Sequence, residues 1–158
     1  MELKSYQKEV IADLARYLEL VVELQSPAKA YQALWNEKNV LAGFGGMPNY
    51  VDVLPGVPHV CAKVPTGGGK TYIAASSLRT IFDAMPQRRA KAVVWLVPSE
   101  AILTQTRKAL ENPDHPYRQR LDVDFGGRVQ VYSKEQALMG QNFTASVVTE
   151  QLSLFVFS

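Results

Sequence analysis

The fold is determined by Pro65-Thr66-Gly67-Gly68-Gly69-Lys70-Thr71, a run of three glycines followed by Lys and Thr. An apolar run at residues 59–64 precedes it and is typical of a strand, whereas residues 70–84 contain no Gly or Pro and are typical of a helix. Consecutive glycines let backbone N–H groups converge on phosphate oxygens, and the helix N-terminus adds partial positive charge. A strand, a glycine-rich loop and a helix in this order predict a nucleotide-binding P-loop.

Two side chains of the motif have predicted roles in binding a nucleotide. Lys70 is placed to reach the β and γ phosphates, and the hydroxyl of Thr71 is a suitable ligand for Mg²⁺. The predicted nucleotide-binding residues are Thr66, Gly67, Gly68, Gly69, Lys70 and Thr71. The alternative is a flexible glycine-rich turn that happens to precede Lys-Thr, and the flanking strand and helix argue against it.

The segments after the motif predict an open α/β sheet. The run that follows Lys91 is continuously apolar to residue 97, as in parallel strands that are buried on both faces. Ser99 is a suitable cap for a further helix. Strands are predicted at residues 128–132 and 145–149, before a final apolar segment. The order β-α-β-α-β-β-α is that of an α/β fold with a mostly parallel sheet and helices on both faces.

Two helices are predicted before this region. Apolar residues recur at helical spacing over residues 5–24, and Ser26-Pro27 forms the expected start of a second helix, which extends to about residue 38. The next stretch is too rich in Gly and Pro for a regular element. We therefore expect a helical segment at residues 1–42, a connection at 43–58 and a nucleotide-binding domain at 59–158.

Composition limits the function classes. The chain has 158 residues, of which 47% are hydrophobic and 20% charged, and this composition predicts a globular protein. Its formal net charge is +2, and it has no strongly basic arm of the kind that indicates nucleic-acid binding. The single cysteine, Cys61, excludes an internal disulfide, and the two histidines are too isolated for a metal site. The N-terminus does not resemble a secretory signal, and no apolar run reaches the ~18 to 20 residues of a membrane-spanning helix. The expected setting is cytoplasmic, with no membrane partner.

Several segments together resemble the superfamily 2 helicases and translocases. The P-loop of that superfamily often lacks the first glycine, and Val64 stands at that place here. Tyr6-Gln7 is similar to the glutamine motif that reads adenine, and Val97-Pro98-Ser99 is similar to motif Ia. The segment at residues 145–152, which contains Thr149, is similar to the strand-plus-Thr segment of the same proteins. The residues of these motifs and their order along the chain most resemble those of the ATPase subunit of type III restriction enzymes.

The resemblance implies a fold and a set of functional residues. It implies a RecA-like P-loop NTPase fold, an ATP-dependent DNA translocase or helicase, and ATP and Mg²⁺ as cofactors. It assigns a catalytic role to Lys70, adenine recognition to Gln7 and Mg²⁺ binding to Thr71. Its nucleic-acid contacts fall on Pro98, Ser99 and Thr149. The implied partners are double-stranded DNA, the remaining motor and nuclease domains, and a modification (methyltransferase) subunit.

Other interpretations remain for these segments. Gln7 is also explained as a surface residue of an amphipathic helix, and Ser99 as a helix cap alone. The runner-up function is another superfamily 2 motor that acts on DNA or RNA. A nucleotide-binding module without turnover and a small P-loop kinase are further alternatives. The arginine-bearing lid of a kinase is a poor fit, because Arg88-Arg89 is more simply a solvated connection.

One requirement for hydrolysis is missing from the sequence. ATP hydrolysis in this class needs a second carboxylate site, usually Asp-Glu, and no Asp-Glu pair occurs in the chain. Asp122 and Asp124 are closely spaced but follow no apolar strand. We therefore expect the N-terminal part of an incomplete first RecA-like lobe, inactive by itself. In such a fragment the strand at residues 59–64 and the apolar segment at 152–157 would lack their sheet partners.

Overall fold

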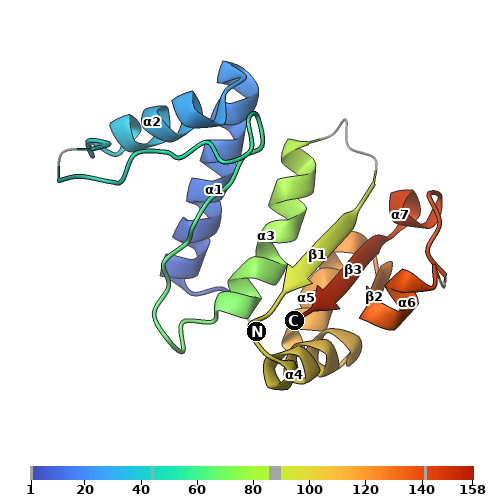
Figure 1. Ribbon diagram of the computed structural model, residues 1–158. Coiled ribbons are helices and arrows are strands. Elements are labelled where there is room, and N and C mark those ends of the chain that lie inside the picture. The colour runs from blue at the N-terminus through green and yellow to red at the C-terminus, as the bar shows by residue number, and fades with distance from the viewer. Residues whose placement is uncertain (1, 44, 86–89, 141) are drawn as a thin grey trace. The chain divides into compact units, whose positions relative to one another are not determined.

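The computed structural model describes residues 2–43, 45–85, 90–140 and 142–158. The chain divides into two compact units, which we call the N-terminal unit (Glu2–Ile73) and the C-terminal unit (Ala74–Ser158). Helix α3 (Lys70–Ala84) begins in the first and ends in the second (Figure 1).

Two packed helices begin the N-terminal unit. Helix α1 spans Ser5–Leu24 and α2 spans Pro27–Glu37, as the apolar spacing predicts. Ser26 caps α2, because its hydroxyl accepts a hydrogen bond from the backbone N–H of Lys29. The buried side chains of the two helices are Gln7, Tyr17, Leu18, Leu20, Pro27, Ala30 and Leu34. An ion pair of 2.7 Å between Arg16 and Glu37 also joins α1 to α2 at the surface.

The connection to the P-loop contains little regular structure. The Gly/Pro-rich stretch has one isolated bridge, between Ala42 and Met47. The predicted strand at residues 59–64 is wrong, because this segment pairs with no strand in the described part of the chain. Its side chains are exposed except that of Val64. An apolar run becomes a strand only where a neighbour satisfies its backbone groups, and local sequence does not report that neighbour.

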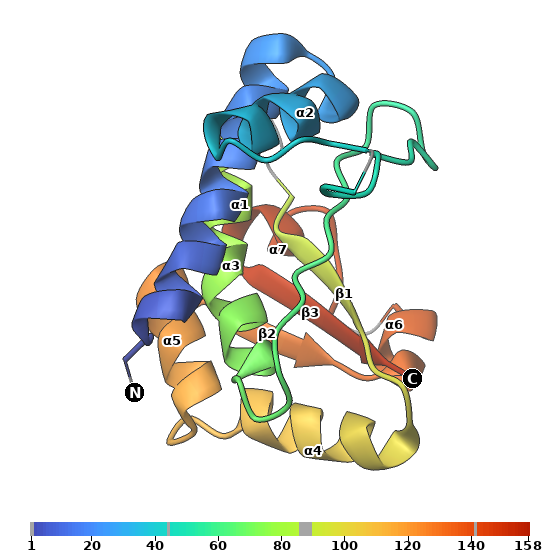
Figure 2. The same cartoon turned by 90° about the vertical axis from the view of Figure 1, so that its left-hand side faces the viewer.

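The C-terminal unit contains a three-stranded parallel sheet. Its strands are β1 (Ala92–Leu96), β2 (Val129–Tyr132) and β3 (Leu152–Phe157), in the order β1-β3-β2. Figure 2 shows β3 between its two neighbours. The helices after β1 are α4 (Glu100–Glu111) and α5 (Pro116–Phe125), and those after β2 are α6 (Lys134–Leu138) and α7 (Val147–Glu150). The expected α/β fold with a parallel sheet is confirmed.

The core lies against one face of this sheet. Alternate residues of β3 point to it, and Leu152, Leu154 and Val156 are almost completely buried there. The other buried members, from α3, α4, α5 and β2, are Ala75, Leu78, Leu110, Leu121, Val129 and Val131. Helices α3, α4 and α5 therefore cover this face.

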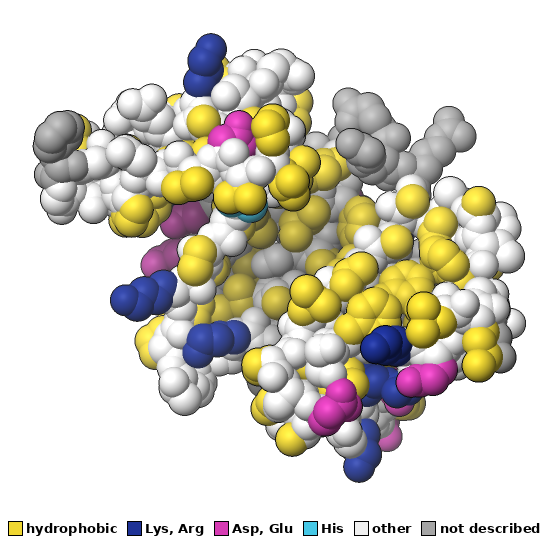
Figure 3. Space-filling view, viewed as in Figure 1, with side chains coloured by type: hydrophobic (Ala, Val, Ile, Leu, Met, Phe, Trp, Pro, Cys, Tyr) yellow, Lys and Arg dark blue, Asp and Glu magenta, His cyan; other side chains and the backbone are white. Residues whose placement is uncertain are grey.

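The opposite face is covered unevenly. Over β2 and β3, Tyr132 stacks on Phe155 with ring centroids 4.9 Å apart, and Phe143 packs edge-on against both rings. Over β1, Val94 and Leu96 are 62% and 73% exposed. Apolar side chains gather on this side of the sheet in Figure 3. The edge strand β1 thus leaves its outward apolar residues open.

Two sequence-based expectations for the C-terminal half are wrong. Residues 145–149, expected as a strand, overlap the short helix α7 (Val147–Glu150). The final apolar segment, expected to lack a partner, is the central strand β3 and pairs with both β1 and β2. Both runs are apolar, so periodicity alone did not distinguish them. Helix α5 was not predicted, although Pro116 in its first turn and Gly126 at its left-handed C-cap are ordinary helix signals.

Candidate nucleotide-binding site

The predicted P-loop forms a tight turn before α3. The backbone N–H of Gly68 donates to the carbonyl oxygen of Pro65 at 3.0 Å. Gly67 and Gly69 have φ values of +76° and +73°, in the left-handed region that favours glycine. Helix α3 begins at the next residue, Lys70. The turn therefore brings a glycine-rich backbone to a helix N-terminus, which is the arrangement that binds phosphate.

Close packing behind the loop requires glycine at two positions. A Cβ atom on Gly69 would lie 2.6 Å from Nε2 of Gln7. A Cβ atom on Gly68 would lie 2.6 Å from a methyl carbon of Val64 and 2.9 Å from the carbonyl oxygen of Pro65. Any other residue would displace these neighbours and distort the turn. The loop is thus built for bare backbone, as a triphosphate cradle requires.

Tyr6 and Gln7, at the start of α1, contact the P-loop directly. The hydroxyl of Tyr6 donates to the carbonyl oxygen of Gly68 at 2.8 Å, and Nε2 of Gln7 donates to the same oxygen at 3.0 Å. The other end of the Gln7 carboxamide, Oε1, accepts a hydrogen bond from the backbone N–H of Lys4. Gln7 is only 5% exposed. The motif recognised in the sequence therefore lies against the P-loop, and its role towards adenine stays a prediction.

Lys70 is exposed at the loop. Its ammonium group donates to the carbonyl oxygen of Pro65 at 2.9 Å. A phosphate could exchange with this neutral carbonyl as the acceptor, because bonds between charged groups are stronger. Thr71, the predicted Mg²⁺ ligand, is half-buried in the first turn of α3, and Thr66 is exposed. The residues present therefore fit a nucleotide triphosphate with its metal ion.

A family comparison identifies the class of protein. The family model described as "Type III restriction enzyme, res subunit" matches residues 1–153. The chain belongs to this family. The match includes Tyr6, Gln7 and the whole P-loop, and confirms the resemblance found in the sequence. The family has a RecA-like P-loop fold and supplies the helicase/ATPase-type subunit of restriction enzymes that act on DNA. Neither the search of curated proteins nor that of solved structures gave a match.

The residues expected to contact nucleic acid in this family are not brought together. Ser99 follows the carboxyl end of β1 and caps α4, with its hydroxyl accepting from the N–H of Ile102. Thr149 lies in α7, before the amino end of β3, and its hydroxyl donates to the carbonyl oxygen of Ser146. Since β1 and β3 are parallel, Ser99 lies at the carboxyl ends of the strands and Thr149 at their amino ends. Pro98 is exposed beside Ser99, so only these two can share a contact surface.

Asp122 and Asp124 do not form a carboxylate site. Both lie on α5, where each makes an ion pair of 2.8 Å, with Arg118 and Arg120 respectively. Among the described residues no group of three His, Cys, Asp or Glu side chains could hold a metal ion. No helix in the described ranges is both long and apolar enough to cross a membrane. Arg88-Arg89 lies outside the described residues.

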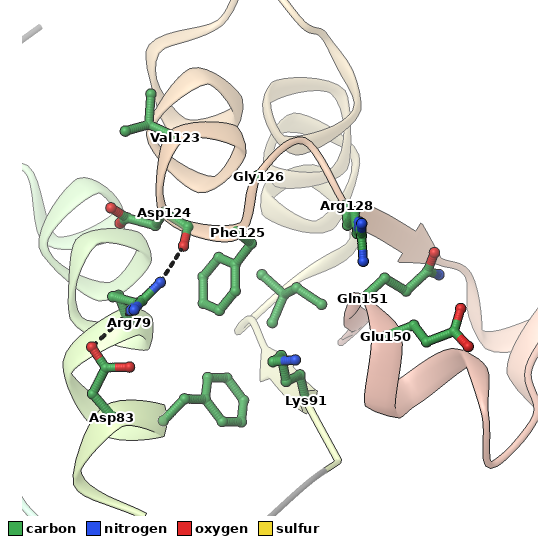
Figure 4. A pocket seen from close by; sticks show the side chains of 12 residues that line it. Arg79, Asp83, Lys91, Val123, Asp124, Phe125, Gly126, Arg128, Glu150 and Gln151 are labelled. Carbon is green, nitrogen blue, oxygen red and sulfur yellow. Dashed lines mark hydrogen bonds and ion pairs between the residues drawn. The ribbon is translucent and has the colours of Figure 1, made fainter. Parts of the chain in front are cut away.

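A separate cavity of about 490 Å³ occurs within the C-terminal unit (Figure 4). Lys91, Arg128 and Gln151, which line it, directly precede β1, β2 and β3. The cavity therefore lies at the amino ends of the parallel strands. Ligands of open α/β sheets bind at the carboxyl ends of the strands, so this position is unusual for a ligand-binding site of this fold.

Several polar side chains around this cavity are already engaged by neighbouring groups. Arg79 contacts Asp83 at 2.7 Å, which raises the pKa of the guanidinium group, and donates to the backbone carbonyl of Asp124 at 2.9 Å. Figure 4 shows both bonds at the cavity wall. The ammonium group of Lys91 donates to the carbonyl oxygen of Thr149. No predicted site residue lines the cavity, and we do not assign the nucleotide to it.

Proposed function

We propose that this chain binds ATP with Mg²⁺ through its P-loop, as part of an ATP-driven DNA translocase or helicase of a type III restriction endonuclease. The observation that carries the proposal is the glycine turn at residues 67–69, held against α1 and followed at once by Lys70 at the helix N-terminus. The proposed partners are double-stranded DNA, the other motor and nuclease domains of the enzyme, and its modification subunit.

Each residue of the site has a distinct proposed role. Bound ATP would supply the phosphoanhydride bond whose hydrolysis drives the motor. The backbone of Gly67, Gly68 and Gly69 would form the phosphate cradle: the N–H of Gly68 closes the turn onto Pro65, and the N–H groups of Gly67 and Gly69, with the start of α3, would hold the phosphate oxygens. Lys70 would place its positive charge on the β and γ phosphates, and the hydroxyl of Thr71 would bind Mg²⁺. Gln7, which lies on α1 beside the same loop, would recognise the adenine base.

Binding and turnover are expected to separate in this chain. No Asp-Glu pair is present to position the metal ion and the attacking water. We therefore propose that the 158-residue chain binds ATP but does not hydrolyse it steadily. Sustained phosphate release that is lost on Lys70→Ala would contradict this second part alone.

Titration calorimetry with a non-hydrolysable ATP analogue and Mg²⁺ tests the binding proposal. Lys70→Ala removes a charge-assisted bond and is expected to weaken binding roughly 10- to 100-fold. Lys63→Ala is the matched control, because Lys63 is also an exposed lysine close to the loop. Its affinity should equal that of the wild type, and both variants should keep the wild-type thermal midpoint. Equal affinity of the Lys70→Ala variant and the wild type would contradict the proposal.

A further inference from the structure

The peptide between Gly68 and Gly69 is held from one side by two donors. Its carbonyl oxygen accepts hydrogen bonds from Tyr6 and from Gln7, at 2.8 Å and 3.0 Å. A carbonyl oxygen has two lone pairs, so these bonds use its full capacity. Both donors come from the first turn of α1, which fixes the direction of this carbonyl.

The same peptide has its N–H group on the other side. In a planar trans peptide the C=O and N–H bonds point in opposite directions. Holding the Gly68 carbonyl towards α1 therefore turns the N–H of Gly69 away from α1. This N–H makes no hydrogen bond to any residue in the described ranges. It lies directly before Lys70, where helix N–H groups have no intrahelical acceptor.

We propose that Tyr6 is a positioning residue of the nucleotide site, whose hydroxyl fixes the Gly68–Gly69 peptide so that the Gly69 N–H is directed at a bound polyphosphate. The inference rests on the proposed function. A run of three glycines has many accessible conformations, and ordering it on binding would reduce affinity. A hydrogen bond that orders the loop beforehand removes part of that cost.

Tyr6 is separable from Gln7 in this role. The Gln7 carboxamide also bonds to the backbone of Lys4 and is buried, so its replacement would disturb the start of α1 as well. Tyr6 is 38% exposed, and within the described ranges its hydroxyl hydrogen-bonds only to the Gly68 carbonyl oxygen. Tyr6→Phe therefore deletes one hydrogen bond and leaves the ring in place.

Binding of two ligands to the full chain tests the proposal. The ligands are an ATP analogue and inorganic triphosphate, each with Mg²⁺, because a phosphate-directed effect does not depend on the base. For Tyr6→Phe we expect both affinities to fall by the same factor, roughly three- to tenfold, with an unchanged thermal midpoint. Tyr31→Phe is the matched control, since the Tyr31 hydroxyl donates to the carbonyl oxygen of Pro48, outside the P-loop. Its affinities should stay at the wild-type values.

The other outcomes are distinguishable. Wild-type affinity of Tyr6→Phe for both ligands would overturn the inference and leave the proposed function standing. A loss for the ATP analogue alone would also overturn it, because Tyr6 would then act on the nucleoside. Failure of the wild-type chain to bind either ligand would overturn the proposed function and this inference together.

Discussion

Leu154 lies in register with Val93 across the β1–β3 ladder and is completely buried. Leu154 occupies the central strand, with β2 on its other side, and its side chain belongs to the core that α3, α4 and α5 cover. The segment that looked unpartnered in the sequence is thus the centre of the sheet.

Replacing Leu154 should destabilise the C-terminal unit strongly. Leu154→Ala removes buried methyl groups and leaves a cavity, for which we expect a loss of about 2 to 5 kcal/mol in the free energy of unfolding. Leu138→Ala is the control, because that leucine is 78% exposed, and a change within about 0.5 kcal/mol is expected. Urea denaturation measures both. Similar losses in the two variants would contradict the assignment of β3 to the core.

Alternate residues of β1 should respond differently to charge. Val94 is 62% exposed, whereas its neighbour Trp95 packs against the core on the other face. Val94→Lys is expected to keep the fold in a urea denaturation experiment, because the added charge stays in solvent. Trp95→Lys is expected to unfold the unit. Equal destabilisation by both would show that the strand faces are assigned wrongly.

The ion pair between α1 and α2 should be sensitive to acid. Its hydrogen bond from Arg16 holds the pKa of Glu37 below the usual value of 4.5. A lowered pKa in the folded state stabilises above the unfolded pKa, and this contribution is lost as pH falls through the folded value. Amide exchange in α1 and α2 should therefore be faster in Glu37→Gln than in the wild type at neutral pH.

This difference should disappear as pH falls through the lowered pKa of Glu37, because below it the carboxyl group is protonated in both the folded and the unfolded state. Glu9→Gln, which changes another exposed carboxylate of α1, should match the wild type at both pH values. A difference for Glu37→Gln that persists or grows in acid would show that the ion pair is not its cause.

Ser99 allows capping and DNA contact to be separated. Asp caps helices as well as Ser does, so Ser99→Asp should keep the stability of α4, whereas Ser99→Ala should lose about 0.5 to 2 kcal/mol. If Pro98 and Ser99 contact the DNA backbone, as the family resemblance implies, the added negative charge should weaken duplex binding severalfold at constant salt. Fluorescence anisotropy measures this affinity. Unchanged DNA binding by Ser99→Asp would reduce Ser99 to a helix cap.

The sequence predicted those elements that local signals define. Caps and apolar spacing placed α1, α2 and α4, and the continuous apolar run placed β1. The failures concern pairing, which is non-local. Residues 59–64 have the composition of a strand but pair with no strand that the structure describes, and β3 is central although it is the last apolar segment.

The candidate site shows the same division. The glycines and Lys70 follow from the chemistry of phosphate binding, and the structure places them in one turn with Gln7 beside it. The bond between Tyr6 and Gly68 joins residues 62 positions apart, and no local pattern predicts it. Likewise, only the parallel pairing of β1 and β3 shows that Ser99 and Thr149 lie at opposite ends of the strands.

The most direct test of the account is a ¹⁵N–¹H spectrum of the full chain titrated with an ATP analogue and Mg²⁺. We expect the largest amide shifts at residues 66–71, where backbone N–H groups would meet the phosphates, and little change at Lys91, Arg128 and Gln151 around the separate cavity. Shifts confined to those three cavity residues, with residues 66–71 unchanged, would contradict the claim that the P-loop is the nucleotide site.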